Sequence, residues 1–392
     1  MYKILTIICS IFIAHLSFGE IRFVRANFYG DAASSVTISW DQEKGRAKFL
    51  MYSSSANFET FASQKIDRRK CDKGMNNNFV RLVDLKPATK YYFKVIDSKD
   101  TSKVYYVETA PDDPNVRLSF IAGGDSRTNR DIRILGNKMV AKVKTHAVLF
   151  NGDFTAYDTK SQWINWFTDW EATIGEDGRV TPLVITRGNH ERSNRVLVNL
   201  FDVPQRKILF DTQFGGDLVN VVSLNSEIRR NGKQVKFLAE SLKEHENYSW
   251  QMPQYHRPIR PHVSFKSEQE KQYAYWIPLF EAYKNIGLCL ENDSHLCKIT
   301  WPILSSSDTT IADEGFVRND ASGIVYAGEG CWGAPIRKAN DTKSWTRSAA
   351  SVNQINWIFV SKDKIELRKI LYENVDEVGS LSENDRFSMP RN

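Results

Sequence analysis

The sequence predicts two folded domains, an all-β sandwich followed by an α/β domain. In residues 20–110, apolar and polar residues alternate in short runs separated by Gly, Asn, Asp and Pro, as half-buried strands do. From residue 117 onward, apolar strand-like runs alternate with stretches of helical periodicity. With 392 residues, 41% of them hydrophobic, the chain is long enough for each domain to bury its own core.

Residues 1–19 have the pattern of a signal peptide. A basic start at Lys3 is followed by an apolar run from Ile4 to Ala14 and by the small residues Ser17 and Gly19. This run is shorter than the roughly 20 apolar residues that a transmembrane helix needs. No later segment is long and apolar enough to span a bilayer. We therefore expect cleavage, export to the periplasm or the extracellular space, and a mature chain without a membrane span.

Four cysteines would remain after cleavage: Cys71, Cys289, Cys297 and Cys331. An even number in an oxidising compartment is compatible with disulfides, and Cys289 and Cys297 bracket one short segment. Free buried thiols fit the sequence as well, so both alternatives stay open.

The charge of the chain is only mildly basic. A formal net charge of +6 helps to attract anionic substrates without identifying them. No run of Lys and Arg resembles a nucleic-acid-binding stripe, so we expect no nucleic-acid partner.

Within the first domain, the runs at residues 36–40 and 91–96 are the clearest predicted strands. The segment Leu85-Lys-Pro-Ala-Thr-Lys-Tyr-Tyr-Phe93 resembles the corner of fibronectin type III domains, in which a tyrosine pins the turn before a core strand. The resemblance implies a fibronectin type III-like sandwich. We expect it to position or protect the second domain.

Residues 111–116 form a linker in which Pro111 and Pro114 stop strand pairing. The second domain then covers residues 117–372, and a polar tail covers 373–392. Its predicted strands are residues 118–123, 147–151, 183–186, 219–224, 249–253, 286–290, 323–327 and 355–361. Its predicted helices are residues 132–144, 162–174, 234–245 and 270–284.

Polar residues of metal-ligand type follow most of these strands, which the hydrophobic pattern alone does not require. The residues are Asp125, Asp153, Asn189, His256 and His295. Because the carboxyl ends of strands in an open α/β sheet converge on one crevice, we expect these side chains to meet. Such a set suits two metal ions, since imidazole favours Zn or Fe while carboxylate and amide oxygens also accept Mn or Mg.

Two ions bridged by Asp153 would lower the pKa of a shared water and clamp the oxygens of an in-line phosphoryl transfer. A hydroxide nucleophile at neutral pH follows from this arrangement.

The order Gly124-Asp125, Gly152-Asp153, Gly188-Asn-His-Glu191, His256 and Asn292-Asp-Ser-His295 resembles the calcineurin-like metallophosphoesterase superfamily. Together with the sandwich in front, the chain most resembles purple acid phosphatases. The resemblance implies a four-layer α/β/β/α fold with two divalent or trivalent metal ions, of which Fe, Zn, Mn and Mg are the candidates.

Carried over by motif, the resemblance implies a ligand set for each metal. Asp125, Asp153 and His295 would hold the first metal, and Asp153, Asn189 and His256 would hold the second.

The resemblance also implies catalytic residues. His190, beside a ligand, would steady the phosphate and the charge of the transition state. His262 is a candidate general acid for the departing alkoxide, because imidazole titrates near neutrality. An exposed loop histidine is the alternative for that position.

Three positions depart from the family pattern. Arg127 stands where many members have a metal-binding His, and its guanidinium fork suits bidentate phosphate binding instead. Tyr157 lies one residue beyond the place of the chromophore tyrosine, which Ala156 occupies, and remains a candidate ligand. Asp293 stands where a His usually binds the second metal, and its carboxylate would harden that site.

The predicted function is that of an exported enzyme that hydrolyses phosphate monoesters by attack of a metal-bridging hydroxide. The expected partner is a small phosphorylated substrate. A phosphodiesterase on the same scaffold and a non-catalytic binding protein with a degraded metal site are the alternatives.

Overall fold

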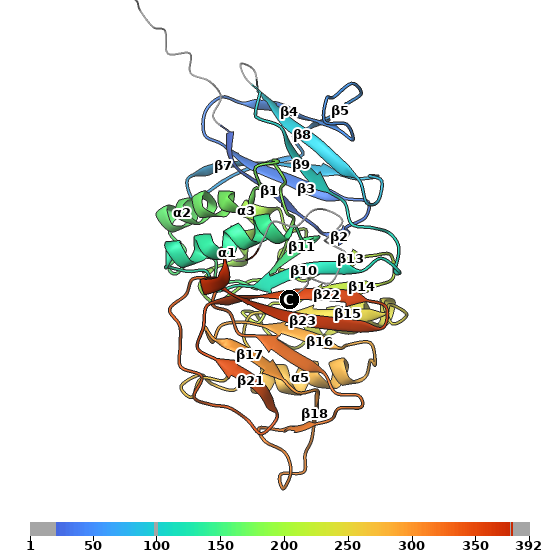
Figure 1. The fold of residues 1–392 in the computed structure, drawn as a ribbon, viewed down its shortest axis with the longest axis vertical. Helices are drawn as coiled ribbons and strands as arrows, with labels where there is room; N and C mark the ends of the chain where they lie inside the picture. Colours follow the sequence, from blue (N-terminus) through green and yellow to red (C-terminus); the bar gives the residue numbers. More distant parts are fainter. Residues whose placement is uncertain (1–20, 98–100, 377, 379–392) are drawn as a thin grey trace, which may run out of the picture.

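The computed structural model describes residues 21–97, 101–376 and 378. The predicted signal peptide lies outside these residues, as does most of the predicted tail. A β-rich N-terminal domain occupies one end of the elongated molecule, and a mixed α/β domain makes up the rest (Figure 1). Within the described part, no helix has the length and apolarity that crossing a membrane would require.

The N-terminal domain is a β-sandwich, as predicted. Its strands are β1 (Ile21–Asn27), β2 (Gly30–Asp31), β3 (Val36–Gln42), β4 (Ala47–Ser53), β5 (Ala62–Lys65), β6 (Arg68–Asp72), β7 (Met75–Leu82), β8 (Lys90–Asp97) and β9 (Tyr105–Glu108). The order β5-β4-β8-β9 forms one sheet, and β1-β3-β7-β6 lie in the other. The backbone N–H of Lys86 donates to the Tyr91 hydroxyl over 2.8 Å, which is the predicted tyrosine corner.

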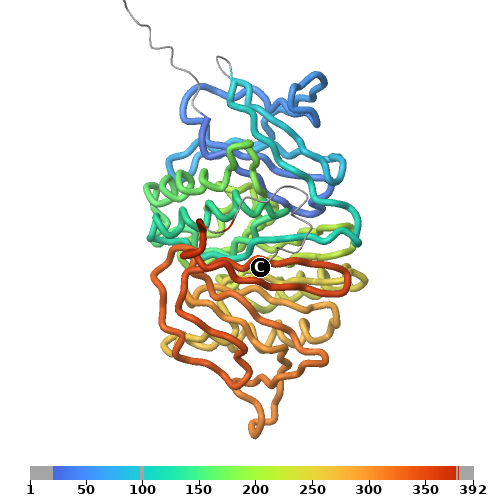
Figure 2. The backbone as a smooth tube through the Cα atoms, viewed as in Figure 1, coloured from blue at the N-terminus to red at the C-terminus, as the bar shows by residue number. Residues whose placement is uncertain are grey.

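The second domain contains two large sheets. Its strands are β10 (Leu118–Gly123), β11 (Ala147–Phe150), β12 (Leu183–Ile185), β13 (Phe210–Phe214), β14 (Val219–Ser223), β15 (Trp250–Gln254), β16 (Leu288–Glu291), β17 (Cys297–Thr300), β18 (Ile303–Ser305), β19 (Phe316–Arg318), β20 (Val325–Gly328), β21 (Thr346–Ala350), β22 (Gln354–Ser361) and β23 (Lys364–Leu371). One sheet has the order β23-β22-β10-β11-β12, and the other has the order β2-β13-β14-β15-β16-β20-β17-β21. Figure 2 shows the red strands near the end of the described chain in the middle of the molecule, where β22 pairs antiparallel with β10.

Helices cover the outer faces of these sheets. They are α1 (Arg130–Val143), α2 (Lys160–Trp170), η1 (Glu171–Thr173), α3 (Asn194–Phe201), α4 (Lys233–Glu244), α5 (Glu270–Glu281) and η2 (Tyr372–Asn374). The side chains of α1–α3 share a core with the first sheet, whereas those of α4 and α5 pack on the second. In β14, Val221 faces the core shared with the first sheet, while Val222 faces α4 and α5. The result is the predicted four-layer α/β/β/α fold.

The two domains share their sheets. Strand β1 pairs in parallel with β12 at Asn27 and Leu183, so the sandwich strands extend the first sheet of the α/β domain to nine strands. Strand β2 likewise pairs with β13 of the second sheet. The sandwich is therefore attached to the α/β domain by backbone hydrogen bonds and by a common hydrophobic core, in addition to the linker.

The four cysteines of the described residues are free thiols. Cys71 is exposed, and the other three are buried. The sequence was compatible with disulfides and with free thiols, and the structure contains free thiols.

Candidate metal centre

Three candidate ligands follow neighbouring parallel strands of the first sheet. Asp125 comes after β10, Asp153 after β11 and Asn189 after β12. The backbone of Asp125 and of Asp153 is left-handed, with φ of 54° at each, a conformation that costs free energy in a non-glycine residue. These turns bring both carboxylates to the same edge of the sheet.

The other candidate ligands follow two paired strands of the second sheet. His256 comes after β15, and Asp293 and His295 come after its parallel neighbour β16. Asp293 and His295 are also left-handed, with φ of 70° and 57°. We call the whole set the candidate ligand cluster: Asp125, Asp153, Asn189, His256, Asp293 and His295.

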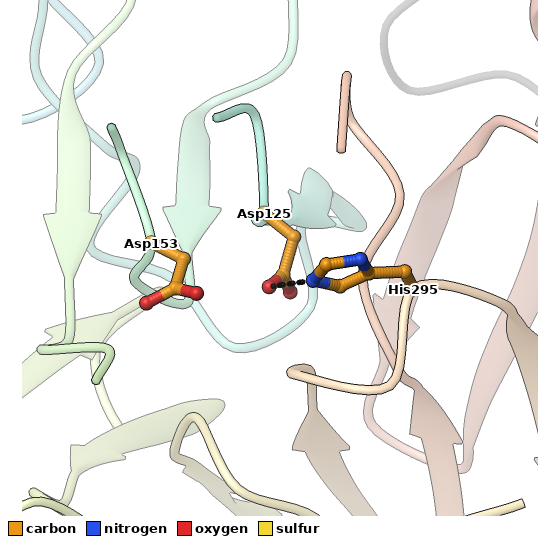
Figure 3. Close-up of side chains that lie close together, drawn as sticks. All are labelled: Asp125, Asp153 and His295. Carbon is orange, nitrogen blue, oxygen red and sulfur yellow. Dashed lines mark ion pairs between the residues drawn. The ribbon is translucent and has the colours of Figure 1, made fainter. Parts of the chain in front are cut away.

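Asp125, Asp153 and His295 form the first of two triads. Their potential ligand atoms all lie within 4.8 Å of one another, and all three residues are buried (Figure 3). His295 Nε2 lies 3.2 Å from Asp125 Oδ1, while its Nδ1 lies 3.0 Å from the Pro335 carbonyl oxygen. Because only an N–H can bond to that carbonyl, Nδ1 carries the proton and Nε2 faces the carboxylates, as a metal ligand would.

Asp153, His256 and Asp293 form the second triad, so Asp153 belongs to both. His256 Nε2 lies 3.3 Å from Asp153 Oδ1, 3.6 Å from Asp293 Oδ1 and 3.0 Å from Asn189 Oδ1. Its Nδ1 lies 2.8 Å from the Asn151 carbonyl oxygen, which again directs Nε2 toward the cluster. The geometry thus forms two adjacent groups of donors joined by one shared carboxylate.

The electrostatics of the cluster call for cations. Burial alone would lower the pKa of His256, but the Asp153 and Asp125 carboxylates outweigh it and hold this pKa well above its ordinary value. Burial would raise the pKa of Asp153, yet His256 and His190 bring it to about 2. Within the described residues, Asp125 Oδ1 and Asp153 Oδ2 are buried without a hydrogen-bond donor. Two metal ions would fit this donor set and satisfy both oxygens.

Asp293, at the position of a usual histidine, has the geometry of a ligand. Its Oδ1 faces His256, and its Oδ2 lies 2.6 Å from Lys266 Nζ. The ammonium offsets the extra negative charge that a carboxylate brings in place of a neutral imidazole. No sequence pattern points to Lys266, because only the folded loop brings it to Asp293.

His190 and Arg127 lie at the edge of the cluster. The backbone N–H of His190 donates to Asp153 Oδ1 over 2.8 Å, and its Nε2 lies 3.7 Å from Asp153 Oδ2. Its Nδ1 bonds to the Ala156 carbonyl oxygen, which leaves Nε2 available on a half-buried ring. Arg127 Nη1 lies 3.2 Å from His295 Nε2. Both side chains can therefore reach a group bound at the cluster.

Tyr157 does not lie in the cluster, which corrects the prediction that it is a candidate ligand. Its side chain is 64% exposed, whereas the candidate ligands of both triads are buried. The backbone N–H of Tyr157 donates to Gln162 Oε1 as the chain approaches α2, and this turn directs the phenol to solvent.

His262 is also placed differently from its predicted role. Its ring is fully buried, with Nε2 2.7 Å from Thr346 Oγ1 and the ring packed against Trp345. Burial and the nearby Lys298 lower the pKa of His262 to about 2. A buried ring that is neutral at ordinary pH does not serve as a general acid for a leaving group, which corrects the predicted role of His262. The ring is not an exposed loop residue either, which corrects the alternative.

Glu191 holds the loop that carries Asp153, the carboxylate shared by the two triads. Its buried carboxylate accepts from the backbone N–H groups of Gly188, Asp153 and Phe154 over 2.8, 3.0 and 2.9 Å. Burial and the Asp153 carboxylate raise the pKa of Glu191 to about 8. The sequence motif contained Glu191, but its role as the residue that orients the Asp153 loop emerges only from these contacts.

Gly330 shows how tightly the backbone closes on the cluster. A side chain at this position would place its Cβ 2.1 Å from Asp125 Oδ2, and the φ of +90° also favours glycine. The segment that follows β20 therefore forms a wall behind the first triad.

Two family models match the chain. Residues 21–109 match the purple acid phosphatase N-terminal domain, and residues 122–286 match the calcineurin-like phosphoesterases. A search of curated proteins found no match.

Solved structures show the same fold at low sequence identity. Purple acid phosphatase PPD1 from yellow lupin (Lupinus luteus) seeds is 14% identical, with a TM-score of 0.72 over 91% of this chain and 73% of its own. PhoD is 11% identical, with a TM-score of 0.63 over 89% and 88%. GAP50, the anchor in the inner membrane complex of Plasmodium, is 13% identical, with a TM-score of 0.51 over 68% and 87%.

These matches confirm the resemblance inferred from the motifs. The chain combines a purple acid phosphatase N-terminal domain with a calcineurin-like phosphoesterase domain, and it is a metal-dependent phosphoric ester hydrolase.

Proposed function

We propose that this hydrolase acts on phosphate monoesters and that it does so outside the cytoplasm. The observation that carries the proposal is the pair of buried triads that share Asp153. Two cations held there would supply an activated water and neutralise the charge of a phosphoryl group. The mixed carboxylate, amide and imidazole donors accept Fe, Zn, Mn or Mg.

Cationic side chains around the cluster support a preference for monoesters. The Arg127 guanidinium lies beside His295, Arg337 Nη1 donates to the Asp293 carbonyl oxygen over 2.9 Å, and Lys266 bonds to the Asp293 carboxylate. A monoester dianion has more charge to offer these groups than a diester monoanion does. Arg127 can bind two of its oxygens through the guanidinium fork.

His190 takes the place of His262 as the candidate proton donor. The Ala156 carbonyl oxygen holds its Nδ1, so a protonated ring presents Nε2–H toward a group bound beside Asp153. The His190 side chain is 24% exposed, which allows its Nε2 to regain a proton from solvent.

The location outside the cytoplasm is supported by the sequence pattern of residues 1–19 alone. N-terminal sequencing of the protein recovered from its native host tests it. Cleavage near Gly19 is the expected result, and an intact N-terminus on a cytoplasmic protein would contradict it.

The activity is tested with phenyl phosphate and diphenyl phosphate as the monoester and the diester. We expect two equivalents of metal per chain, a higher kcat/KM for the monoester, loss of hydrolysis after chelation and its return with added metal. The reverse order of kcat/KM would make the protein a diesterase. A folded protein that binds almost no metal would instead be the non-catalytic alternative.

A further inference from the structure

A cavity of about 190 Å³ adjoins the second triad. Asp293 forms one side of it, and the loop between β15 and α5 forms the rest. Its lining is mostly polar, with Arg257, Lys266, Ser267 and Gln269 beside Pro258, Pro261 and Phe265. Because Asp293 belongs to both the cavity and the triad, a phosphoryl group bound at the cluster would have its ester oxygen and leaving group within reach of this space.

Phe265 is the one aromatic residue of the cavity lining. Its side chain is 70% exposed, although burying a phenylalanine is strongly favourable in water. The loop holds it there, because the backbone N–H of Lys266 donates to the Val263 carbonyl oxygen and that of Ser264 donates to Asn340 Oδ1. The exposure is therefore built into the local fold.

Arg337 connects this ring to the cluster. Its guanidinium carbon lies 5.4 Å from the centroid of the Phe265 ring, and its Nη1 donates to the Asp293 carbonyl oxygen. A cation over an aromatic face within about 6 Å is attractive and restricts the ring. One residue thus fixes both the aromatic wall and the backbone of a candidate ligand.

From this geometry we infer that Phe265 determines the leaving-group specificity, and that the substrates are phosphate esters of aromatic or similarly flat, apolar alcohols. The inference rests on the proposed monoesterase function. A flat leaving group would pack against the open part of the ring, where aromatic contact adds to the apolar area removed from water. A short alkyl leaving group would leave the ring exposed.

The test compares phenyl phosphate with ethyl phosphate in the metal-loaded full chain and in Phe265→Ala. We expect kcat/KM for phenyl phosphate to fall about 3- to 10-fold while that for ethyl phosphate changes less than about 2-fold. Phe265→Trp should retain the preference. The inhibition constant of phenylphosphonate should rise in Phe265→Ala, whereas that of methylphosphonate should not, and this readout involves no chemical step.

Ile311→Ala is the matched control, since Ile311 is 65% exposed and does not line this cavity. It should leave the ratio of the two substrates unchanged. An active wild-type protein whose ratio is the same in Phe265→Ala would overturn the inference and leave the proposed function standing. A wild-type protein that binds two metals but hydrolyses neither ester would overturn both.

Discussion

Two buried groups of charged residues both include residues at the ends of β15 and β16, and they differ in how their charge is balanced. One is the candidate ligand cluster. The other, which we call the lysine network, consists of Tyr255, Glu291, Lys298 and Glu329. Lys298 Nζ lies 2.7 Å from Glu291 Oε2 and 2.6 Å from Glu329 Oε1, and the Tyr255 hydroxyl donates to Glu291 Oε1 over 2.8 Å.

The difference shows how a structural polar group can be told from a functional one. In the lysine network, burial alone would lower the pKa of Lys298, but Glu291 and Glu329 outweigh it and raise this pKa, so the chain supplies its own buried cation. In the ligand cluster, buried oxygens of Asp125 and Asp153 have no donor among the described residues. Buried carboxylates need a positive partner, and beside these two the described chain places only imidazoles, whose ring nitrogens a cation from solution can share.

The largest expected effect comes from the carboxylate that both triads share. Asp153→Asn should lower kcat/KM for a phosphate monoester by more than about 10³-fold, because it removes charge from both metal positions at once. Enzyme kinetics and metal analysis of the purified variant would measure this. Asp211 in β13 accepts a hydrogen bond from the Ser241 hydroxyl of α4, away from the cluster. The isosteric change Asp211→Asn is therefore the control and should retain two metals. Retained activity in Asp153→Asn would contradict the assignment of the candidate ligand cluster as the catalytic site.

The lysine network should respond through stability. Lys298→Met leaves two buried glutamates without their cation, so we expect the free energy of unfolding to fall by about 3–5 kcal/mol, with or without metal. Denaturant titration would measure this loss. Adding Glu329→Gln to Lys298→Met should restore part of it, since one uncompensated charge is then removed. A metal-dependent loss would mean that the two groups are not independent.

A substitution at Asp293 distinguishes the two triads experimentally. Asp293→Asn should weaken binding of the second metal by about 10- to 100-fold and leave the first in place, because Asp293 belongs to the second triad alone. Calorimetric titration with Mn or Zn would resolve the two equivalents. Asp293→His, which restores the residue usual in the family, should keep both. Equal weakening of the two equivalents in Asp293→Asn would argue against distinct positions.

The smallest expected effect concerns His262 beside the lysine network. Its folded-state pKa of about 2 lies below its ordinary value of 6.5, so in acid the unfolded chain binds a proton that the folded chain does not. Stability is therefore lost as the pH falls below about 6.5, by up to about 1.4 kcal/mol per pH unit. His262→Gln should show a shallower loss in denaturant titrations at pH 7.5, 6 and 5. The pH–rate profile of His262→Gln should match that of the wild type. If His262 were the general acid, the variant would lose the fall in rate at high pH that a general acid produces.

Most of the fold could be predicted from the hydrophobic pattern. The predicted strands at residues 118–123 and 147–151 are β10 and β11, and the predicted helix at 234–245 is α4. The short helix α3 and strand β13 were not predicted, since α3 has only eight residues and β13 carries polar residues at three of its five positions. The pairing of β1 with β12 was not predictable either, because it depends on a contact between distant segments.

The sequence by itself determined the ligand types and their order, since apolar runs locate the strand ends and the residues after them are Asp, Asn and His. It could not say which way a loop turns. Only the tertiary structure decided that Tyr157 faces solvent, that His262 is sealed beside Thr346, and that Lys266 meets Asp293. Those outcomes depend on packing between segments far apart in the chain, whereas the strand-end pattern is local and is already present in the order of the residues.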